Sequence, residues 1–132
     1  TIAYENQRML GNIALFMEYY PQAGFCWDVG HEACFAYGRE YMPLFGKRIV
    51  EVHIHDNMGV YNEDLHLLPY DGKIDFERVA KQIASTDYSG SVMLEVNGTN
   101  KCYEELTDDE YYARAAASAK KLADRIEEIR NS

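Results

Sequence analysis

Two of the four histidines of the chain lie in the stretch Glu51-Val52-His53-Ile54-His55-Asp56, and a third follows in Asp64-Leu65-His66. From Val50 onward, aliphatic and polar side chains alternate, as they do in a β-strand with one buried face. This alternation places His53 and His55 on one face and Val50, Val52 and Ile54 on the other. Imidazoles at the end of a strand, followed by Asp-x-His, are residue types that bind divalent metals. Two hydrogen-bonded histidines beside a solvated loop would produce the same pattern, so the rest of the chain has to discriminate between the two.

The composition is that of a globular domain. The 132 residues are 47% hydrophobic, which suffices for a single domain, 1–132, with its own core. The formal net charge of −9 disfavours nucleic acid as a partner, because electrostatic binding to nucleic acid requires clustered Lys and Arg. No apolar run reaches membrane-spanning length and no secretory signal is visible, so we expect no membrane association. Three cysteines without metal-site spacing favour a reducing, cytoplasmic location.

Strand and helix patterns alternate along the whole chain. Short apolar or alternating runs predict four strands, at residues 1–5, 23–28, 49–55 and 91–96. Apolar side chains spaced three and four apart predict helices over 7–20, over 32–41, from an N-cap at Asp75 onward, and from a capping box at Thr107 to Arg130. This order implies an α/β fold of parallel strands joined by right-handed crossovers. The connection 57–73 has the length of a functional loop.

Every predicted strand ends on or next to a side chain that can bind a metal or transfer a proton. The residues are Glu5, Asp28 with His31, His53 with His55, and Glu95. In parallel α/β proteins the carboxyl ends of the strands form the active site, so these side chains should converge. Each acid taken alone could cap a helix or pair with Arg, and His31 could be an ordinary first-turn residue. As a set they favour a metal site.

A mixed carboxylate and imidazole site suits Mn, Co, Fe or Zn better than Ca. We expect one ion to be bound by Glu5, Asp28, His53 and Glu95. A second ion, or a substrate, could be bound by His31, Asp64 and His66. There is no Ser-His-Asp elbow motif, which disfavours acyl transfer through a serine nucleophile.

The same residues resemble the C-terminal half of the xylose isomerase-like TIM-barrel superfamily. That group includes sugar and sugar-phosphate isomerases and epimerases and the apurinic endonuclease IV family. The more specific elements of the resemblance are Asp-x-Gly-His at 28–31 and His-x-His-Asp followed by Asp-x-His within 53–66. The remaining matching pieces are Ile2-Ala3-Tyr4-Glu5-Asn6, Gly72-Lys73-Ile74-Asp75-Phe76, and Tyr88-Ser89-Gly90 leading to Leu94-Glu95.

The resemblance implies a (βα)4 half-barrel that corresponds to strands five to eight of a TIM barrel. It implies that Glu5, Asp28, His53 and Glu95 are the shared metal ligands, and that Glu5 and Glu95 are also the acid/base pair. The pair would move a proton next to a carbonyl of a sugar or sugar phosphate. Contact with the substrate is expected of His31, His55, Asp64 and His66. In the endonuclease branch, His31, Asp64 and His66 would instead hold an additional zinc.

Two departures from the family pattern leave alternatives open. The first four barrel strands are absent, and His53 is not followed by the Gly-Glu-x-x-Arg continuation of the ketose epimerases. Because four strands cannot close an eight-stranded barrel, we expect either a homodimer or a missing N-terminal half-barrel. The principal functional hypothesis is a metal-dependent isomerase or epimerase. The alternatives are an endonuclease IV-type apurinic-site phosphodiesterase and a catalytically inactive half-barrel.

Overall fold

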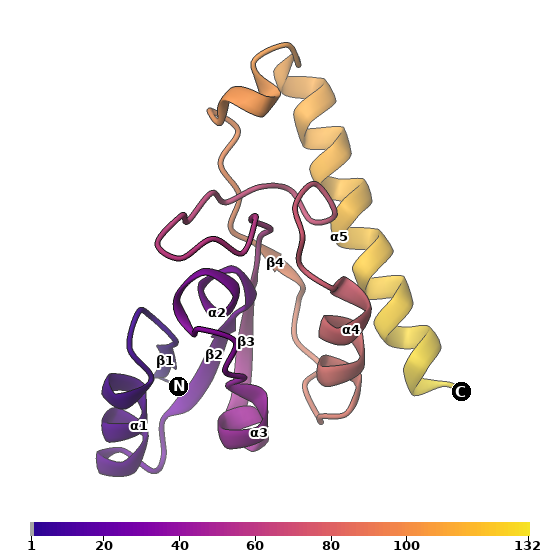
Figure 1. Cartoon of the computed structure of the whole chain (residues 1–132). Helices are drawn as coiled ribbons and strands as arrows, with labels where there is room; N and C mark the ends of the chain where they lie inside the picture. Colours follow the sequence, from indigo (N-terminus) through magenta and orange to yellow (C-terminus); the bar gives the residue numbers. More distant parts are fainter. Residues whose placement is uncertain (1) are drawn as a thin grey trace.

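The computed structural model describes residues 2–132, and its centre is a sheet of four parallel strands (Figure 1). The strands lie side by side in chain order. They are β1 (Ala3–Glu5), β2 (Gly24–Asp28), β3 (Ile49–Ile54) and β4 (Met93–Leu94). Helices between and after them are α1 (Leu10–Tyr19), α2 (Val29–Phe35), α3 (Met42–Phe45), α4 (Phe76–Ala84) and α5 (Asp108–Arg130), with 3₁₀ turns η1 (Gly46–Arg48) and η2 (Lys101–Tyr103). The predicted α/β half-barrel of four parallel strands is confirmed.

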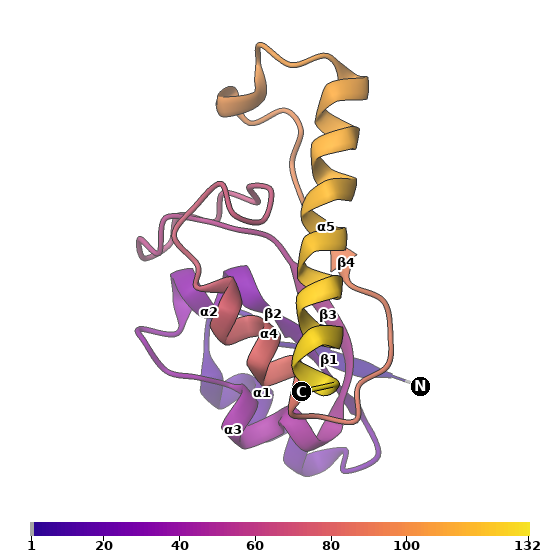
Figure 2. The ribbon, with the colours of Figure 1, turned by 90° about the vertical axis from the view of Figure 1, so that its right-hand side faces the viewer.

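The core lies between the sheet and its helices. Phe25 and Trp27 of β2 and Val52 and Ile54 of β3 are fully buried on this side. They pack with apolar side chains of α4 and α5, among them Val79, Ile83, Leu122 and Ile126. Figure 2 shows α1, α2, α3 and α4 on one side of the sheet, while α5 runs along α4. Within residues 2–132, Figure 2 shows no helix on the opposite side. Asp28 and His53 face this side, because side chains alternate along a strand and the adjacent Trp27, Val52 and Ile54 lie in the core.

The element boundaries differ from the sequence prediction in several places. The helix predicted over 7–20 begins at Leu10, and the one predicted over 32–41 ends at Phe35 and is followed by the short helix α3, which was not predicted. Helix α2 begins at Val29, because Asp28 itself is the N-cap and accepts a 2.6 Å hydrogen bond from the His31 backbone N–H. The predicted strand over 91–96 shortens to Met93–Leu94, and within the described residues it pairs with β3 alone. The predicted first strand begins at Ala3 in the structure, and Thr1 lies outside the described residues.

The alternation predicted for β3 holds for Val52 and Ile54 but not for Val50. The pairing of β2 with β3 is irregular between Phe25 and Cys26. Phe25 pairs with Ile49 and Cys26 pairs with Glu51, so Val50 has no partner in β2. Val50 is 43% exposed, and its side chain lies against Gly24 instead of in the core. An extra residue in one strand of a pair displaces its side chain in this way.

Asp56 organises the long connection after β3. Its carboxylate accepts backbone hydrogen bonds from Asn57, Tyr70, Gly72 and Ile74, at 2.8 to 3.1 Å. The Asp56 backbone also exchanges two hydrogen bonds with Leu67. One fully buried side chain therefore fixes both ends of the segment that carries Asp64 and His66.

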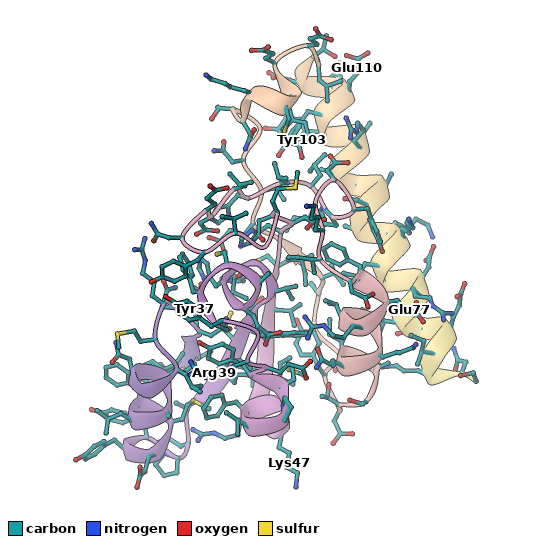
Figure 3. All side chains as sticks on the ribbon, in the orientation of Figure 1. Tyr37, Arg39, Lys47, Glu77, Tyr103 and Glu110 are labelled. Atoms are coloured by element: carbon teal, nitrogen blue, oxygen red, sulfur yellow. The ribbon has the colours of Figure 1, made fainter. Side chains whose placement is uncertain are left out.

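A second apolar cluster lies under the N-terminal half of α5. Leu67 and Leu68 of the connection pack there against Tyr103, Tyr111 and Ala115. Figure 3 labels Tyr103 between the connection and the projecting end of α5. The Tyr103 hydroxyl accepts from the Leu68 N–H at 2.7 Å and donates to Asp71 at 3.0 Å. This cluster supports the connection from the side away from the sheet.

A search of the described residues finds no helix that combines the length and the apolar character needed to cross a bilayer.

Candidate metal centre

The first cluster of ligand-type side chains lies at the carboxyl ends of the strands. It consists of Glu5, Asp28, His53 and Glu95, and one ligand atom of each lies within 4.8 Å of all the others. Asp28 and His53 are direct partners in the pairing of β2 with β3. Glu5 and Glu95 approach from the two edge strands. The Nδ1 atom of His53 is 2.7 Å from Glu95 Oε2 and 3.6 Å from Glu5 Oε2.

Several atoms of this cluster are buried without a hydrogen bond. Asp28 Oδ2, His53 Nδ1 and Glu95 Oε2 have no aligned hydrogen-bond partner among residues 2–132. The 2.7 Å separation of His53 Nδ1 and Glu95 Oε2 is therefore a close approach and not a well-formed hydrogen bond. Buried polar atoms left unpaired are costly, so their convergence on one point fits a cation. The donor set of three carboxylates and one imidazole suits a divalent metal ion.

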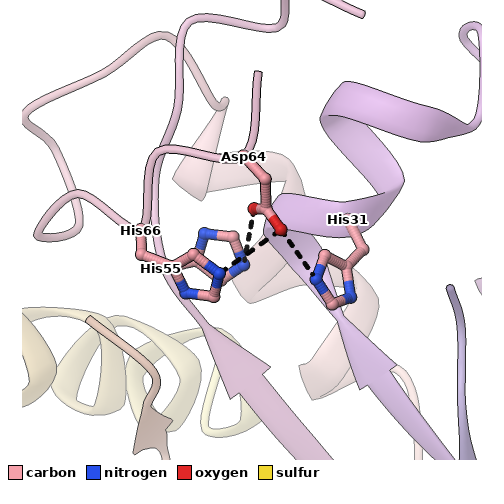
Figure 4. Close-up of side chains that lie close together, drawn as sticks. All are labelled: His31, His55, Asp64 and His66. Atoms are coloured by element: carbon pink, nitrogen blue, oxygen red, sulfur yellow. Dashed lines mark hydrogen bonds and ion pairs between the residues drawn. The ribbon is translucent and has the colours of Figure 1, made fainter. Parts of the chain in front are cut away.

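The second cluster is built around Asp64 (Figure 4). It adjoins the first cluster, since the ring of His31 also contacts Glu5. Three imidazoles turn their Nε2 atoms toward its carboxylate, at 3.1 Å for His31, 3.3 Å for His66 and 3.8 Å for His55. Asp64 Oδ1 is buried and unpaired among the described residues. The sequence predicts His31, Asp64 and His66 for a second site, and in the structure His55 lies with them.

Two of these imidazoles are held through their other ring nitrogen. His31 Nδ1 lies 2.8 Å from Glu5 Oε1 and 3.1 Å from the Asn6 carbonyl. His66 Nδ1 lies 2.7 Å from the Glu95 carbonyl, and the His66 backbone has a φ of 49°, in the left-handed region that non-glycine residues seldom adopt. Metal-binding histidines are commonly oriented by such a bond to a carboxylate or a carbonyl. His31 and His66 are thus preorganised with Nε2 facing the second cluster.

The charges around Asp28 and His31 reinforce one another. Burial alone would lower the pKa of His31, but the hydrogen bond to Glu5 and the carboxylates of Asp28 and Asp64 outweigh it and raise the pKa to about 9. Burial opposes ionisation of Asp28, yet the hydrogen bond from His55 and the neighbouring imidazoles lower the pKa of its carboxyl. Asp28 is therefore an anion at neutral pH, as a metal ligand must be.

Comparison with known proteins agrees with this arrangement of strands and helices. The family model described as xylose isomerase-like TIM barrel matches residues 5–129. The chain belongs to this family. The resemblance inferred from the sequence motifs is thereby confirmed.

Two relatives of this xylose isomerase-like chain are longer than the chain itself. It is 35% identical over 109 residues to the uncharacterized protein y4fM of Sinorhizobium fredii (strain NBRC 101917 / NGR234), a match that covers 82% of this chain and 33% of y4fM. It also superposes on the crystal structure of a D-tagatose 3-epimerase-like protein, with a TM-score of 0.60 and 25% identity. That superposition covers 99% of this chain and 48% of the epimerase-like chain. The chain thus spans about a third to a half of these relatives.

The exposure of the side chains separates those a substrate can reach from those it cannot. In this xylose isomerase-like chain, Glu5, Asp64 and His66 each have a side chain that is 25% exposed, and that of Glu95 is 43% exposed. His55, which the sequence analysis expected to contact substrate, is completely buried and presents no surface to a small molecule.

Asn6 is a site residue to which the sequence analysis assigned no role. It is fully buried, donates to the Asp28 carbonyl at 2.8 Å and accepts from the Asp28 N–H at 2.8 Å. These bonds join the exit of β1 to the end of β2 and hold Asp28 at the centre of the site. The Glu5-Asn6 pair was part of the family motif, but only the pairing of β1 with β2 reveals what Asn6 does.

Proposed function

We propose that the chain forms the metal-binding half of a divalent-metal-dependent sugar or sugar-phosphate isomerase or epimerase. The observation that carries this proposal is the convergence of Glu5, Asp28, His53 and Glu95 from four successive strands within 4.8 Å. The likeness to a D-tagatose 3-epimerase-like protein supports an epimerase in particular. Because the chain covers 48% of that protein, we assign the activity to a site that a second half-barrel completes.

The four residues of the first cluster have two roles in this proposal, metal binding and proton transfer. Asp28 and His53, at the ends of the central strands, are the ligands that take no part in proton transfer. When bound, the ion supplies polarisation of the substrate oxygens. Glu5 and Glu95 act as the acid/base pair, which their partly exposed side chains permit. One carboxylate removes the proton next to the carbonyl, and the other returns a proton to the opposite face of that carbon or to the adjacent carbon.

The neighbouring second cluster extends the site toward the substrate. Asp64 and His66 are partly exposed and lie next to His31. A carboxylate and imidazoles can bind the hydroxyl groups of a sugar, and a protonated His31 can also bind a phosphate group. These residues could alternatively hold a second ion, of which Zn would be the best match for a set rich in imidazole.

Metal content measured by mass spectrometry tests the first part of the proposal. We expect about one Mn, Co, Fe or Zn ion in the first cluster of each chain, and loss of that ion in Asp28→Asn and in His53→Ala. Asp75→Asn is the control, because Asp75 is the exposed N-cap of α4 and is not a member of either cluster. Unchanged metal stoichiometry in both site variants would overturn the assignment.

Proton transfer can be tested separately from metal binding. Incubation with ketoses and ketose phosphates in D₂O should introduce deuterium next to the carbonyl, as seen by NMR. Glu95→Gln should lose this exchange. Bound metal without exchange against any such substrate would favour a non-catalytic half-barrel.

The second cluster also supports a second candidate function, a zinc-dependent apurinic-site phosphodiesterase of the endonuclease IV type. His31, His66 and Asp64 are suited to zinc. The net charge of −9 argues against it, because DNA binding needs positive charge and Lys47, Arg48 and Lys73 are scattered along the chain. Cleavage of a duplex that contains an abasic site, with no exchange on sugars, would favour this candidate.

A further inference from the structure

The three imidazoles around Asp64 are not equivalent. His31 and His66 are each anchored through Nδ1, which leaves Nε2 for the second cluster. His55 has the opposite arrangement. Its Nε2 lies 3.0 Å from Asp28 Oδ1, and its Nδ1 has no hydrogen-bond partner among residues 2–132. The nitrogen that His55 turns toward the clusters is therefore already engaged with Asp28.

The direction of that hydrogen bond follows from its partners. An ionised carboxylate can only accept, so the His55 Nε2 must carry the hydrogen and donate it. A nitrogen that donates a hydrogen bond has no lone pair left for a metal ion. The His55 ring is also fixed in place, because it stacks on His66 with ring centroids 4.0 Å apart and lies against Gly30.

Asp28 is the residue that this bond orients. Its Oδ1 atom accepts from the His31 N–H at 2.6 Å and from His55 at 3.0 Å. The Asn6 side chain donates a hydrogen bond to the Asp28 carbonyl and accepts one from the Asp28 N–H. The Asp28 Oδ2 atom is buried and is left without a hydrogen bond within the described chain, and Asp28 is a member of the first cluster. Two donors on one oxygen thus leave the other oxygen for an ion.

We propose that His55 is a positioning residue, which donates to Asp28 Oδ1 and so presents Asp28 Oδ2 to a metal ion in the first cluster. This inference rests on metal binding by that cluster as proposed above. It replaces contact with substrate as the role of His55, in accordance with the complete burial of the ring. Outer partners of metal ligands typically change metal affinity by roughly 10- to 100-fold when they are removed.

A matched pair of substitutions tests the hydrogen bond. His55→Gln retains an amide donor, whereas His55→Leu has a similar volume and no donor. The dissociation constant for Zn is measured by competition with a chromophoric chelator, with folding checked by circular dichroism. We expect His55→Leu to weaken binding by roughly 10- to 100-fold and His55→Gln to recover most of that loss. Equal binding by His55→Leu and wild type, or equal losses in both variants, would overturn the proposal.

The same measurement in an Asp64→Asn, His66→Ala background separates the two clusters. If His55 acts through Asp28, its substitution still weakens binding when the second cluster has been dismantled. If the effect disappears, His55 is a ligand of the second cluster and the proposal fails. Asp28→Asn distinguishes failure of the proposed role of His55 from failure of the proposed function. If metal binding survives in Asp28→Asn, the metal site and the role of His55 are both overturned. If metal binding is lost in Asp28→Asn but normal in His55→Leu, only the role of His55 is overturned.

Discussion

At the scale of single residues, the site depends on how closely Gly30 approaches His55. Gly30 lies in the first turn of α2, and a Cβ atom at this position would be 1.9 Å from His55 Cε1. Such a contact cannot be relieved by a flexible side-chain end, because the His55 ring is also packed against His66. The absence of a side chain at Gly30 is what allows His55 to reach Asp28.

Gly30→Ala should therefore lower the free energy of unfolding by about 2 kcal/mol, as overpacking in a filled core does. It should also weaken metal binding, since His55 has to move away from Asp28. Urea denaturation of the metal-free protein measures the first effect. The control is Gly11→Ala in α1, where an added Cβ meets nothing within 4 Å and helix propensity should raise stability by about 1 kcal/mol. A Gly30→Ala protein as stable as wild type would show that the helix can shift without cost.

At the scale of elements, the connection between β3 and α4 is ordered by one carboxylate. Asp56 accepts four backbone N–H groups from residues that flank and follow the Asp64-to-His66 segment. Gly72 permits this approach, because a Cβ there would lie 2.3 Å from Asp56 Oδ1. The second cluster is thus positioned by a loop whose shape depends on Asp56 and not on regular secondary structure.

Asp56→Ala should destabilise the protein by at least about 3 kcal/mol, since it leaves several buried N–H groups without an acceptor. Amide hydrogen exchange over residues 57–73 should accelerate, while the strands β1 to β3 exchange as before. Asp75→Ala is the matched control, because it removes an exposed N-cap carboxylate and should cost about 1 kcal/mol. Protection of residues 57–73 that is unchanged in Asp56→Ala would contradict this account of the loop.

The packing of α4 against α5 includes an ion pair that makes stability depend on pH. The Arg125 guanidinium donates two hydrogen bonds to Glu77, at 2.7 and 2.8 Å, near the Glu77 label in Figure 3. These bonds, with a smaller contribution from Lys81, lower the pKa of Glu77 from its usual 4.5 to about 2. Because the pKa is lower in the folded state, the pair stabilises the protein above pH 4.5 and this stabilisation is lost as the pH falls toward 2.

Glu77→Gln should accordingly lower the melting temperature slightly at pH 6, and the difference from wild type should shrink between pH 4.5 and pH 3. The effect is small because both side chains are partly exposed and salt screens them. Scanning calorimetry at several pH values measures it. Glu18→Gln, at an exposed position of α1, controls for the loss of one negative charge. If the difference in melting temperature between wild type and Glu77→Gln grew as the pH fell, it would contradict stabilisation by this ion pair.

At the scale of the whole molecule, the sheet formed by residues 2–132 is open on one face and along both edges. In this part of the chain β1 and β4 each have a neighbour on one side only. Such edges are prone to pair with other strands. The open face also carries Glu5, Asp28, Glu51 and Glu95, so its closure has to accommodate several carboxylates. Bound cations would reduce their mutual repulsion.

The isolated chain should therefore self-associate, with a dimer as the simplest closed assembly. Size-exclusion chromatography with light scattering should give twice the mass of one chain, and added Mn or Zn should strengthen the association. Met93→Lys places a charge on the edge strand β4, at a side chain that is 46% exposed, and should weaken it. Leu44→Lys, on α3 away from the open face, is the control and should have no effect. A monomer at tens of micromolar with metal present would contradict this expectation.

Local patterns in the sequence were enough to determine the order of the four strands and of the helices α1, α2, α4 and α5, the N-caps at Asp75 and Thr107, and the ligand-type residues near each strand end. These features were predictable because period-two and helical spacing and capping depend on residues close together in the chain. The tertiary structure alone decided that Val50 leaves the core, that β4 is two residues long, and that His55 turns to Asp28. Each of these depends on contacts between segments distant in sequence, such as the 27 residues from Asp28 to His55. Local side-chain patterns do not predict contacts between distant segments, so these features are determined by the packing of the folded chain.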